Sequence, residues 1–402
     1  MKTMYQHSDK NPFFSIFIPA KGRPGYLVDA IESVLLQEFE DMEIVISNNG
    51  ADIALKEVVM RYSEDPRINY VEQPETLAMP MHWEKVTKDL AGDYLLVLTD
   101  RSVMKVGTLR FLHEQIMQTE KWPDVISWSW DLYYDHLKIL LRHPNNNLRF
   151  KTLNSDSQLK SFAQGVINFP YSLPRGLNSC VRNEFIASIR AKHGLAFRTL
   201  NPDFTFAYLC LLNTEQYVYI DSPLFISQGL NVSIGGNAYK GDASEYFNSL
   251  KLEDPFKHVP VKLPIDKSGI HEDFLSMASL CGRSDLLKLW NKSNYYLECF
   301  AEVEAKREAG ILQDSLVDMM ERDLVNTLKS EPMEIRESVN KVRTPTKKFR
   351  SRIRGVIKRL LGSKLESIRR YILLYIKGGL VFSTALESAG FETTVGSKPK
   401  GT

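Results

Sequence analysis

The chain has 402 residues, more than one ordinary hydrophobic core holds, and its length predicts two or three domains. Hydrophobic residues make up 43% and charged residues 25% of the sequence, as in an ordinary globular protein. The net charge is only +2, but residues 341–377 contain thirteen Lys or Arg and one acid, so this segment carries +12 and the rest of the chain −10. This asymmetry predicts an anionic partner for the basic segment alone.

Cysteine usage and the lengths of the apolar runs exclude several protein classes. The four cysteines are too few for a disulfide framework and lack the CxxC spacing of a structural zinc site, which favours a reducing compartment. The N-terminal residues have no signal-peptide core, and the apolar stretches at 371–376 and 378–386 fall well short of the roughly 20 residues that span a bilayer. We therefore expect a cytoplasmic protein, with any membrane contact peripheral and on the inner face.

Strand and helix signals alternate over the first 130 residues. Apolar runs predict strands at 14–18, 43–47, 68–71, 94–98 and 125–130. Helical spacing predicts helices near 27–35, 58–62, 81–90 and 106–117. The alternation predicts an α/β fold, with a Rossmann-like, mostly parallel sheet covered by helices on both faces.

The later chain has a different pattern. Residues 131–175 are less regular and predict an insertion or a mobile loop over the site, whereas apolar spacing from 265 to 335 predicts helices. The expected divisions are an N-terminal extension at 1–12, an α/β domain at 13–264, a helical region at 265–340 and a basic amphipathic tail at 341–402.

Ligands of parallel sheets bind beyond the carboxyl ends of the strands. The residues there are polar or turn-forming, at 19–24, 47–50, 73–75 and 99–102. The first strand is not followed by GxGxxG or GxxxxGK[ST], which disfavours dinucleotide oxidoreductases and P-loop nucleotidases. The chain also lacks HExxH and GxSxG motifs.

Five short segments follow one another in the first 100 residues: FSIFIPAKGRP at 14–24, AIESVLLQ at 30–37, EIVISNNG at 43–50, PETLAM at 74–79 and GDYLLVLTD at 92–100. Together they resemble the family 2 glycosyltransferases, which have the GT-A fold, over about residues 13–240. The resemblance implies that a sugar is moved from a nucleotide-diphosphate donor onto a glycan or lipid-linked acceptor by an inverting reaction. The QxxRW motif of processive polysaccharide synthases is not present.

The resemblance implies donor-binding residues at the strand ends, namely Pro19, Ala20, Lys21, Arg23, Asn48, Asp100 and Arg101. The family usually has an aspartate where this chain has Asn48, whose amide oxygen can still accept a hydrogen bond from a base. The sequence Asn48-Asn49-Gly50 is equally typical of a turn, and the two roles are compatible.

The resemblance places Asp100 beside the donor's ribose and metal-bridged diphosphate, although a strand-end aspartate is also a common cap. Family members typically continue with further acids that bind Mn²⁺ or Mg²⁺, where this chain has Arg101 and Ser102. A single carboxylate provides few of the oxygen ligands that such a cation needs. Either Arg101 neutralises the diphosphate in place of metal, or Asp100 and the diphosphate hold a weakly bound metal while Arg101 points away.

An inverting transfer needs a base for the acceptor hydroxyl. In the family this carboxylate lies about 100 residues after the acidic motif, and Asp203, within NPDFTFA at 201–207, fits that description. The alternative for Asp203 is a helix cap. The segment at 174–182 resembles the family's acceptor-side segment, and 227–233 resembles a loop that closes over the donor.

The basic segment between residues 346 and 377 has a helical pattern. Apolar residues from Ile353 to Ile376 fall on one stripe, and Lys and Arg fill the other positions. Such a helix commonly lies on an anionic membrane, and the alternative is that the stripe packs on the acidic body of the protein. Few aromatic residues are available for stacking, so no nucleic-acid partner is expected.

Three functions from different classes follow from these observations, and one of them is a membrane-docking scaffold in which the basic tail is the functional part. The other two use the α/β domain. The first is a hexosyltransferase-like enzyme of glycan or polysaccharide biosynthesis. The second is a non-catalytic protein that binds nucleotide sugars or glycans on a degenerate GT-A scaffold, for which Arg101 and Ser102 are the main support. Asp100 and Asp203, at the expected separation, favour the enzyme.

Overall fold

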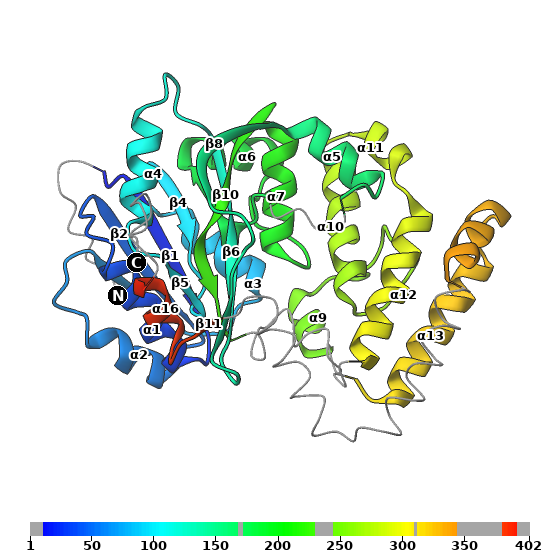
Figure 1. Ribbon diagram of the computed structural model, residues 1–402, viewed down its shortest axis with the longest axis horizontal. Helices are drawn as coiled ribbons and strands as arrows, with labels where there is room; N and C mark the ends of the chain where they lie inside the picture. The colour runs from blue at the N-terminus through cyan, green and yellow to red at the C-terminus, as the bar shows by residue number, and fades with distance from the viewer. Residues whose placement is uncertain (1–10, 168–171, 230–243, 309–311, 344–379, 392–402) are drawn as a thin grey trace. The chain divides into compact units, whose positions relative to one another are not determined.

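The computed structural model describes residues 11–167, 172–229, 244–308, 312–343 and 380–391 (Figure 1). Contacts divide the chain into two compact units. The sheet unit comprises Met1–Gln158, Phe169–Leu230 and Gly379–Thr402, and the helical unit comprises Leu159–Asn168 and Asn231–Gly378. The sheet unit draws on three separate stretches of the chain, and the expected domain boundaries stay a prediction.

Four parallel strands form the first part of the sheet. They are β1 (Phe14–Ala20), β2 (Met42–Asn49), β3 (Ile68–Gln73) and β4 (Tyr94–Val97), in the spatial order β4-β1-β2-β3. All residues of β1, β2 and β4 are buried, as expected of strands covered on both faces. The predicted α/β fold and its parallel strand core are confirmed.

The remaining strands extend the sheet with mixed directions. They are β5 (Ser102–Met104), β6 (Val125–Tyr134), β7 (Ile139–Leu141), β8 (Asn147–Asn154), β9 (Ser179–Arg182), β10 (Gln216–Ser227) and β11 (Leu380–Val381). Strand β9 joins β4 to β6 through antiparallel pairs, and β10 pairs parallel with β6 and antiparallel with β5 and β8. Residues 131–175, for which an insertion or a mobile loop is expected, contain β7, β8 and helix α5 (Ser155–Ala163), so this range is not a loop throughout.

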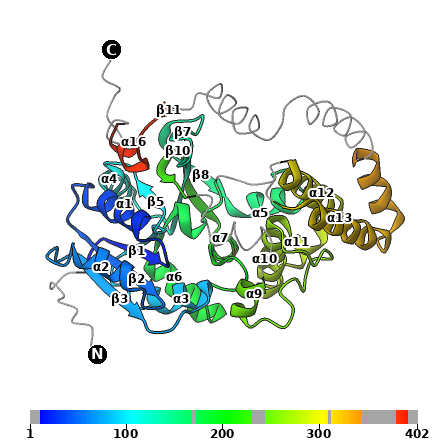
Figure 2. The ribbon, with the colours of Figure 1, turned by 90° about the horizontal axis from the view of Figure 1, so that it is seen from below.

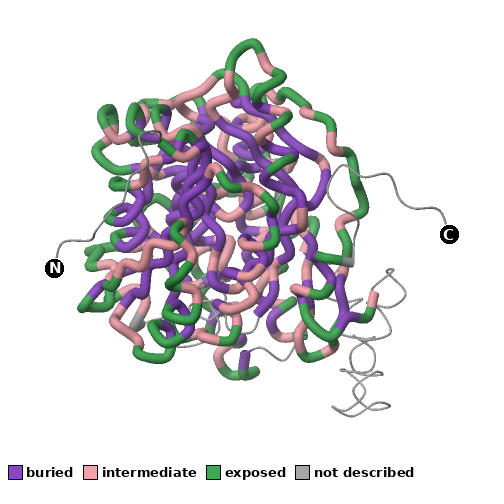
Figure 3. The backbone as a smooth tube through the Cα atoms, turned by 90° about the vertical axis from the view of Figure 1, so that its left-hand side faces the viewer, coloured by how far each residue is buried: buried purple, intermediate pink, exposed green. Residues whose placement is uncertain are grey.

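Alternation along β1 shows that helices cover both faces of the sheet. Successive strand residues point to opposite faces. Ile16 and Ile18 belong to one core cluster with Leu27 of α1 (Pro24–Leu35) and Leu109 of α4 (Thr108–Met117). Phe17, between them, meets Trp83 of α3 (Met79–Thr87) with ring centroids 6.4 Å apart. Buried residues follow the strands, and exposed ones lie on the outer turns (Figure 3).

Three further helices complete the sheet unit. Helix α2 (Ile53–Met60) contacts α1 and β2, and α6 (Asn183–His193) and α7 (Pro202–Asn213) contact each other. Helix α7 also contacts α3. These contacts place α3 and α6 against α7, the helix that contains Asp203.

The last described residues return to the sheet unit. Strand β11 pairs antiparallel with β7, and helix α16 (Ala385–Phe391) follows it (Figure 2). Phe382, Ala385 and Ala389 are buried in a cluster with Val103, Tyr133, Leu140 and Ile226. Tyr133 also donates a hydrogen bond of 2.9 Å to the carbonyl of Phe382. The sheet edge near β5 and β10 is thus completed by residues far along the chain.

The range 265–335, for which apolar spacing predicts helices, contains α10 (Asp266–Leu280), α11 (Ser284–Leu289), α12 (Lys292–Glu308) and α13 (Asp314–Lys329). The helical unit also contains α9 (Ser244–Leu250) before this range and helical residues 333–343 at its end. Among the residues that the structure describes, no helix is both long and apolar enough to cross a membrane. The proposed membrane-binding segment at 346–377 lies outside the described residues.

The close approach of Gly92 to β1 gives a stability prediction. A Cβ at Gly92 would lie 2.6 Å from the backbone nitrogen of Ser15 in a fully paired strand, so Gly92→Ala should destabilise the protein by about 1–3 kcal/mol. Gly25, in the first turn of α1, has open space where a Cβ would lie, so Gly25→Ala is a matched control with little effect. Urea denaturation midpoints measure both, and equal midpoints for Gly92→Ala and the unmodified chain would contradict this packing.

Candidate active site

Asp100 lies at the carboxyl end of the parallel strand pair β1 and β4. It follows β4, while Lys21 and Arg23 follow β1, so the pairing brings the two strand ends together. One oxygen of Asp100, Oδ2, accepts hydrogen bonds from the backbone nitrogen of Lys21 at 3.2 Å and from Nε of Arg23 at 3.0 Å. The other, Oδ1, is 2.8 Å from Nη2 of Arg23. Both oxygens of this fully buried carboxylate therefore face one guanidinium group.

Burial raises the pKa of Asp100 above its ordinary value, and the charge of Arg23 acts in the opposite direction. Arg23 and the Lys21 amide favour the ionised form of this carboxylate and so oppose the effect of burial. The structure therefore shows Asp100 as the counter-ion of Arg23.

Arg101 connects the end of β4 to the end of β10. Its Nη1 donates to Oγ of Ser227 at 3.2 Å and to the carbonyl oxygen of Gln228 at 2.9 Å. The backbone nitrogen of Gln228 in turn donates to the carbonyl of Arg101 at 3.1 Å. Burial lowers the pKa of Arg101, and the like charge of Arg23 lowers it further. Ser102, next in the chain, exchanges a 2.7 Å hydrogen bond with Thr99.

Asp203 occupies the second position of helix α7, where Asn201 is the residue at the N-cap. Its carboxyl lies 3.7 Å from Nη1 of Arg175. Burial raises the pKa of Asp203, while Arg175, the backbone amides of Asp203 and Phe204 and, more weakly, Arg101 lower it. Asp203 thus interacts with the helix terminus, as the cap alternative expects, and also belongs to a charged group.

The charges of both predicted aspartates act on Arg101, which lies in sequence next to Asp100. Arg101 interacts with Arg23, Asp100, Arg175 and Asp203. We call these five residues the charge cluster. It combines three guanidinium groups with two carboxylates, and it comes from the ends of β1 and β4, the segment before β9 and the start of α7.

An aromatic platform adjoins the charge cluster. The guanidinium carbon of Arg175 lies 4.5 Å from the ring centroid of Trp130 and 5.2 Å from that of Phe204. Such contacts stabilise a cation and fix the plane of its guanidinium group. Gly176 permits the close packing beside it, because a Cβ there would be 3.2 Å from Trp83.

The Asn48 side chain holds the turn after β2. Its Nδ2 donates to the carbonyl of Asp52 at 2.7 Å and to the Tyr70 hydroxyl at 2.9 Å, and its Oδ1 accepts from the backbone nitrogen of Asp52 at 3.1 Å. Pro19 and Ala20 are buried at the end of β1, in register with Ser47 and Asn48. Donor binding by these residues stays a prediction, for which Oδ1 retains a second lone pair.

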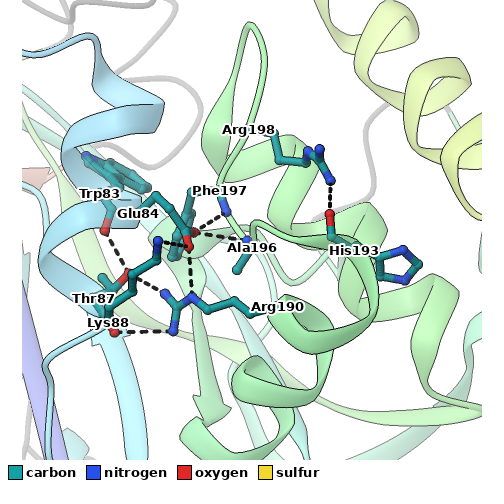
Figure 4. A network of polar contacts seen from close by, with 9 residues as sticks. All are labelled: Trp83, Glu84, Thr87, Lys88, Arg190, His193, Ala196, Phe197 and Arg198. Carbon is teal, nitrogen blue, oxygen red and sulfur yellow. Dashed lines mark hydrogen bonds and ion pairs between the residues drawn. The ribbon is translucent and has the colours of Figure 1, made fainter.

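A buried carboxylate that the sequence analysis missed holds the segment leading to Asp203. Oε2 of Glu84 in α3 accepts hydrogen bonds of 3.0 Å from the backbone nitrogens of both Ala196 and Phe197 (Figure 4). Its Oε1 pairs at 3.0 Å with Nε of Arg190, which also binds the Thr87 hydroxyl. A glutamate in the middle of a helix usually lies on the solvent-exposed face. Only its position among the buried residues of α3 could have suggested that Glu84 is buried and binds backbone amides.

The residues around Asp100 do not fit a dedicated divalent-cation site. Such cations take several oxygen ligands, whereas both oxygens of Asp100 are engaged by Arg23. Over the described ranges of the chain, no group of three or more His, Cys, Asp or Glu could hold a metal ion. A cavity of about 500 Å³, lined by residues that include Leu90, Asp93 and Trp122, lies at the amino end of β4. Asp100 follows the other end of this strand, so the cavity is separate from the candidate site.

Part of this chain is similar in sequence to known glycosyltransferases. Residues 15–169 match the sequence model of the family "Glycosyl transferase family 2". The glycosyltransferase GlyA of Streptococcus pneumoniae serotype 4 is 23% identical over 158 residues, which are 37% of this chain and 23% of GlyA. The match thus spans about a quarter of that protein's length.

Two solved structures have a low structural similarity to this chain. The structure of S. aureus TarS 1–349 has a TM-score of 0.45 at 13% identity, covering 83% of this chain and 91% of that one. The mannosyltransferase PcManGT of Pyrobaculum calidifontis, in complex with GDP-Man and Mn²⁺, has a TM-score of 0.41 at 11% identity, covering 79% and 86%. The family match itself includes β1 to β8 with Asp100 and Arg101, while Asp203 lies beyond it. Residues 15–169 of this chain are therefore similar in sequence to glycosyl transferase family 2.

Proposed function

We propose that this protein transfers a sugar from a nucleotide-diphosphate donor to a hydroxyl of a glycan or lipid-linked acceptor, with inversion at the anomeric carbon. The observation that carries the proposal is the charge cluster, which joins Asp100 and Asp203 beyond the carboxyl ends of the family 2 strands. A cationic group suits the donor's diphosphate, and a separate carboxylate suits the acceptor's proton.

In this mechanism Asp203 is the base. The acceptor oxygen bonds to the anomeric carbon as the bond from that carbon to the β-phosphate oxygen breaks. The nucleoside diphosphate leaves with the electron pair, and the acceptor's proton passes to the Asp203 carboxylate. Burial raises the pKa of Asp203, which makes it a stronger base than an exposed aspartate. The charge of Arg175, 3.7 Å away, acts against burial and favours the ionised form of Asp203.

A non-catalytic binding protein is the second candidate. The replacement of the family's further acids by Arg101 and Ser102 favours it, because these acids bind the metal in the catalytic relatives that the sequence resembles. Both candidates predict nucleotide binding. They differ in turnover, which the first prediction measures directly.

The first prediction from the proposed function is donor cleavage. The full chain, incubated with UDP-, GDP- and dTDP-sugars with and without Mn²⁺, should release nucleoside diphosphate from at least one donor. Release should depend on the acceptor, or on water in its place, because a nucleophile is required. If a nucleotide sugar binds but no nucleotide is released under any of these conditions, the binding-protein candidate is correct and the enzyme proposal is wrong.

The second prediction concerns the base. Asp203→Asn keeps the size of the side chain but removes proton acceptance, so turnover should fall by roughly 10²–10⁴ while donor binding survives. Since the raised pKa of Asp203 must be exceeded for the base to be ionised, turnover of the unmodified chain should increase with pH through that pKa. The pH profile of kcat should lose this acidic limb in Asp203→Asn.

Asp285→Asn is the matched control for this substitution. Asp285 is also an acid in the first turn of a helix, α11, and also pairs with an arginine, Arg283, at 2.7 Å. Its replacement should leave kcat and the pH profile unchanged. An acidic limb that persists in Asp203→Asn would assign the titration to another group, and equal losses of donor binding and turnover would identify Asp203 as a structural cap.

We further propose that residues 346–377 bind an anionic membrane surface on the cytoplasmic side, where a lipid-linked acceptor would be concentrated. These residues lie outside the described ones, and their charge and apolar stripe are the support. Truncation is a poor test, because the residues after 379 complete the sheet unit. A full-length variant with Gln at the basic positions Arg352, Arg354, Lys358, Arg359, Lys364, Arg369 and Arg370 avoids this problem.

The third prediction is measured by vesicle co-sedimentation. The unmodified chain should sediment with anionic vesicles and poorly with neutral ones, and its binding should weaken as salt rises. The Gln variant should lose most of this binding, because each cation near the surface contributes about 1 kcal/mol. Equal sedimentation of the two proteins would instead support packing of the stripe on the protein body.

A further inference from the structure

Arg101 has hydrogen-bond donors that the described protein does not use. Its guanidinium group carries five N–H donors, and its two side-chain hydrogen bonds, to Ser227 and Gln228, both come from Nη1. Within the described ranges, Nε and Nη2 have no hydrogen-bond acceptor. The Nη1 bonds hold the group in place, and the remaining donors form the edge that suits bidentate binding of a phosphate.

The surroundings of Arg101 favour an anion as the ligand of its guanidinium group. The charge cluster contains three positive groups and two negative ones, and Arg23 and Arg175 both disfavour the charged form of Arg101. Burial disfavours it as well. An anion bound at Arg101 would relieve both effects, because it would supply hydrogen-bond acceptors and compensate the repulsion between like charges.

The engagement of Asp100 points in the same direction. For Asp100 to ligate a cation, its bidentate pair with Arg23 would have to open and leave a largely buried guanidinium group without its counter-ion. Breaking such a pair from one side is strongly destabilising, because it leaves a buried charge without compensation. The positive charge that a metal would provide is already present at this position in the form of arginine side chains.

We infer that the donor's diphosphate binds to Arg101, with Arg23 and Arg175 adding positive charge, and that this binding requires no divalent cation. The inference rests on the proposed function and names the group that recognises the donor in that site. Asp100 is then a positioning residue, which holds Arg23 at the end of β1 by its two oxygens.

Calorimetric titration of the full chain with UDP, GDP, dTDP and pyrophosphate tests this inference. At least one nucleoside diphosphate should bind in EDTA, with a Kd within about threefold of its value in Mn²⁺. Arg101→Met should weaken this binding by about tenfold or more, because a charged hydrogen-bonded contact is lost. Pyrophosphate, which has no base or ribose, should be weakened by the same substitution.

Two further variants separate recognition from folding. Arg101→Lys keeps the charge but loses the bidentate edge, so its binding should lie between that of Arg101→Met and the unmodified chain. Arg110→Met removes an arginine that pairs on the surface with Glu38 at 2.9 Å, and it should bind as the unmodified chain does. Equal losses in Arg101→Met and Arg101→Lys, together with a lowered unfolding midpoint, would show a structural role and overturn the inference.

Nucleotide binding to the unmodified chain in EDTA and in Mn²⁺ distinguishes failure of this inference from failure of the proposed function. Binding that disappears in EDTA and returns with Mn²⁺ would overturn the inference and leave the proposed function standing. Failure of every nucleotide to bind in both conditions, with no donor cleavage, would overturn the proposed function and the inference together. Unchanged binding by Arg101→Met would show that the diphosphate is recognised elsewhere.

Discussion

The ion pair between Asp100 and Arg23 is the interaction on which the arrangement of the site depends. A carboxylate with no exposed surface is stable as an ion only with strong partners, and Asp100 has them in one guanidinium group and one backbone amide. The pair ties the turn after β1 to the turn after β4. With these two turns fixed, the next residue, Arg101, is directed toward Ser227 and Gln228 at the end of β10.

A second buried carboxylate has a comparable role on the other side of the site. Glu84 binds two consecutive backbone amides of the segment before α7 and an arginine of α6. It therefore connects α3, α6 and the approach to Asp203 without contacting Asp203 itself. Ion pairs that satisfy backbone donors in this way fix a segment more closely than apolar packing does, because hydrogen bonds are directional. The position of the proposed base follows from that constraint.

Periodicity and strand-end residues were sufficient to predict the α/β core, because both are local properties of the sequence. The buried runs at β1, β2 and β4 and the polar residues after them lie where the pattern indicated. Asp100 and Asp203 were found by resemblance to a family, and the structure brings their surroundings together through Arg101. Which of these residues lie close together depends on the tertiary fold, and a local sequence pattern does not predict it.

The features that escaped prediction are those that depend on distant partners. Strand β8 is an edge strand with a polar sequence, and its pairing with β10 is specified by backbone geometry more than by apolar alternation. The Arg23 partner of Asp100 is 77 residues away, and the partners of Glu84 are 106 to 113 residues away. Strand β11 has two residues, too few to show any periodicity.

The return of β11 and α16 to the sheet has a consequence for how this protein is made. Most of the sheet unit lies before residue 231, but the residues that pack on Val103 and Ile226 come after residue 379. During synthesis, the ribosome must translate the whole helical unit before they become available. Until then the edge of β7 and the apolar surface under β5 and β10 are exposed, and partly folded chains with exposed strand edges tend to associate. Chaperone capture or a translational pause in this interval would affect the yield of folded protein more than its final stability.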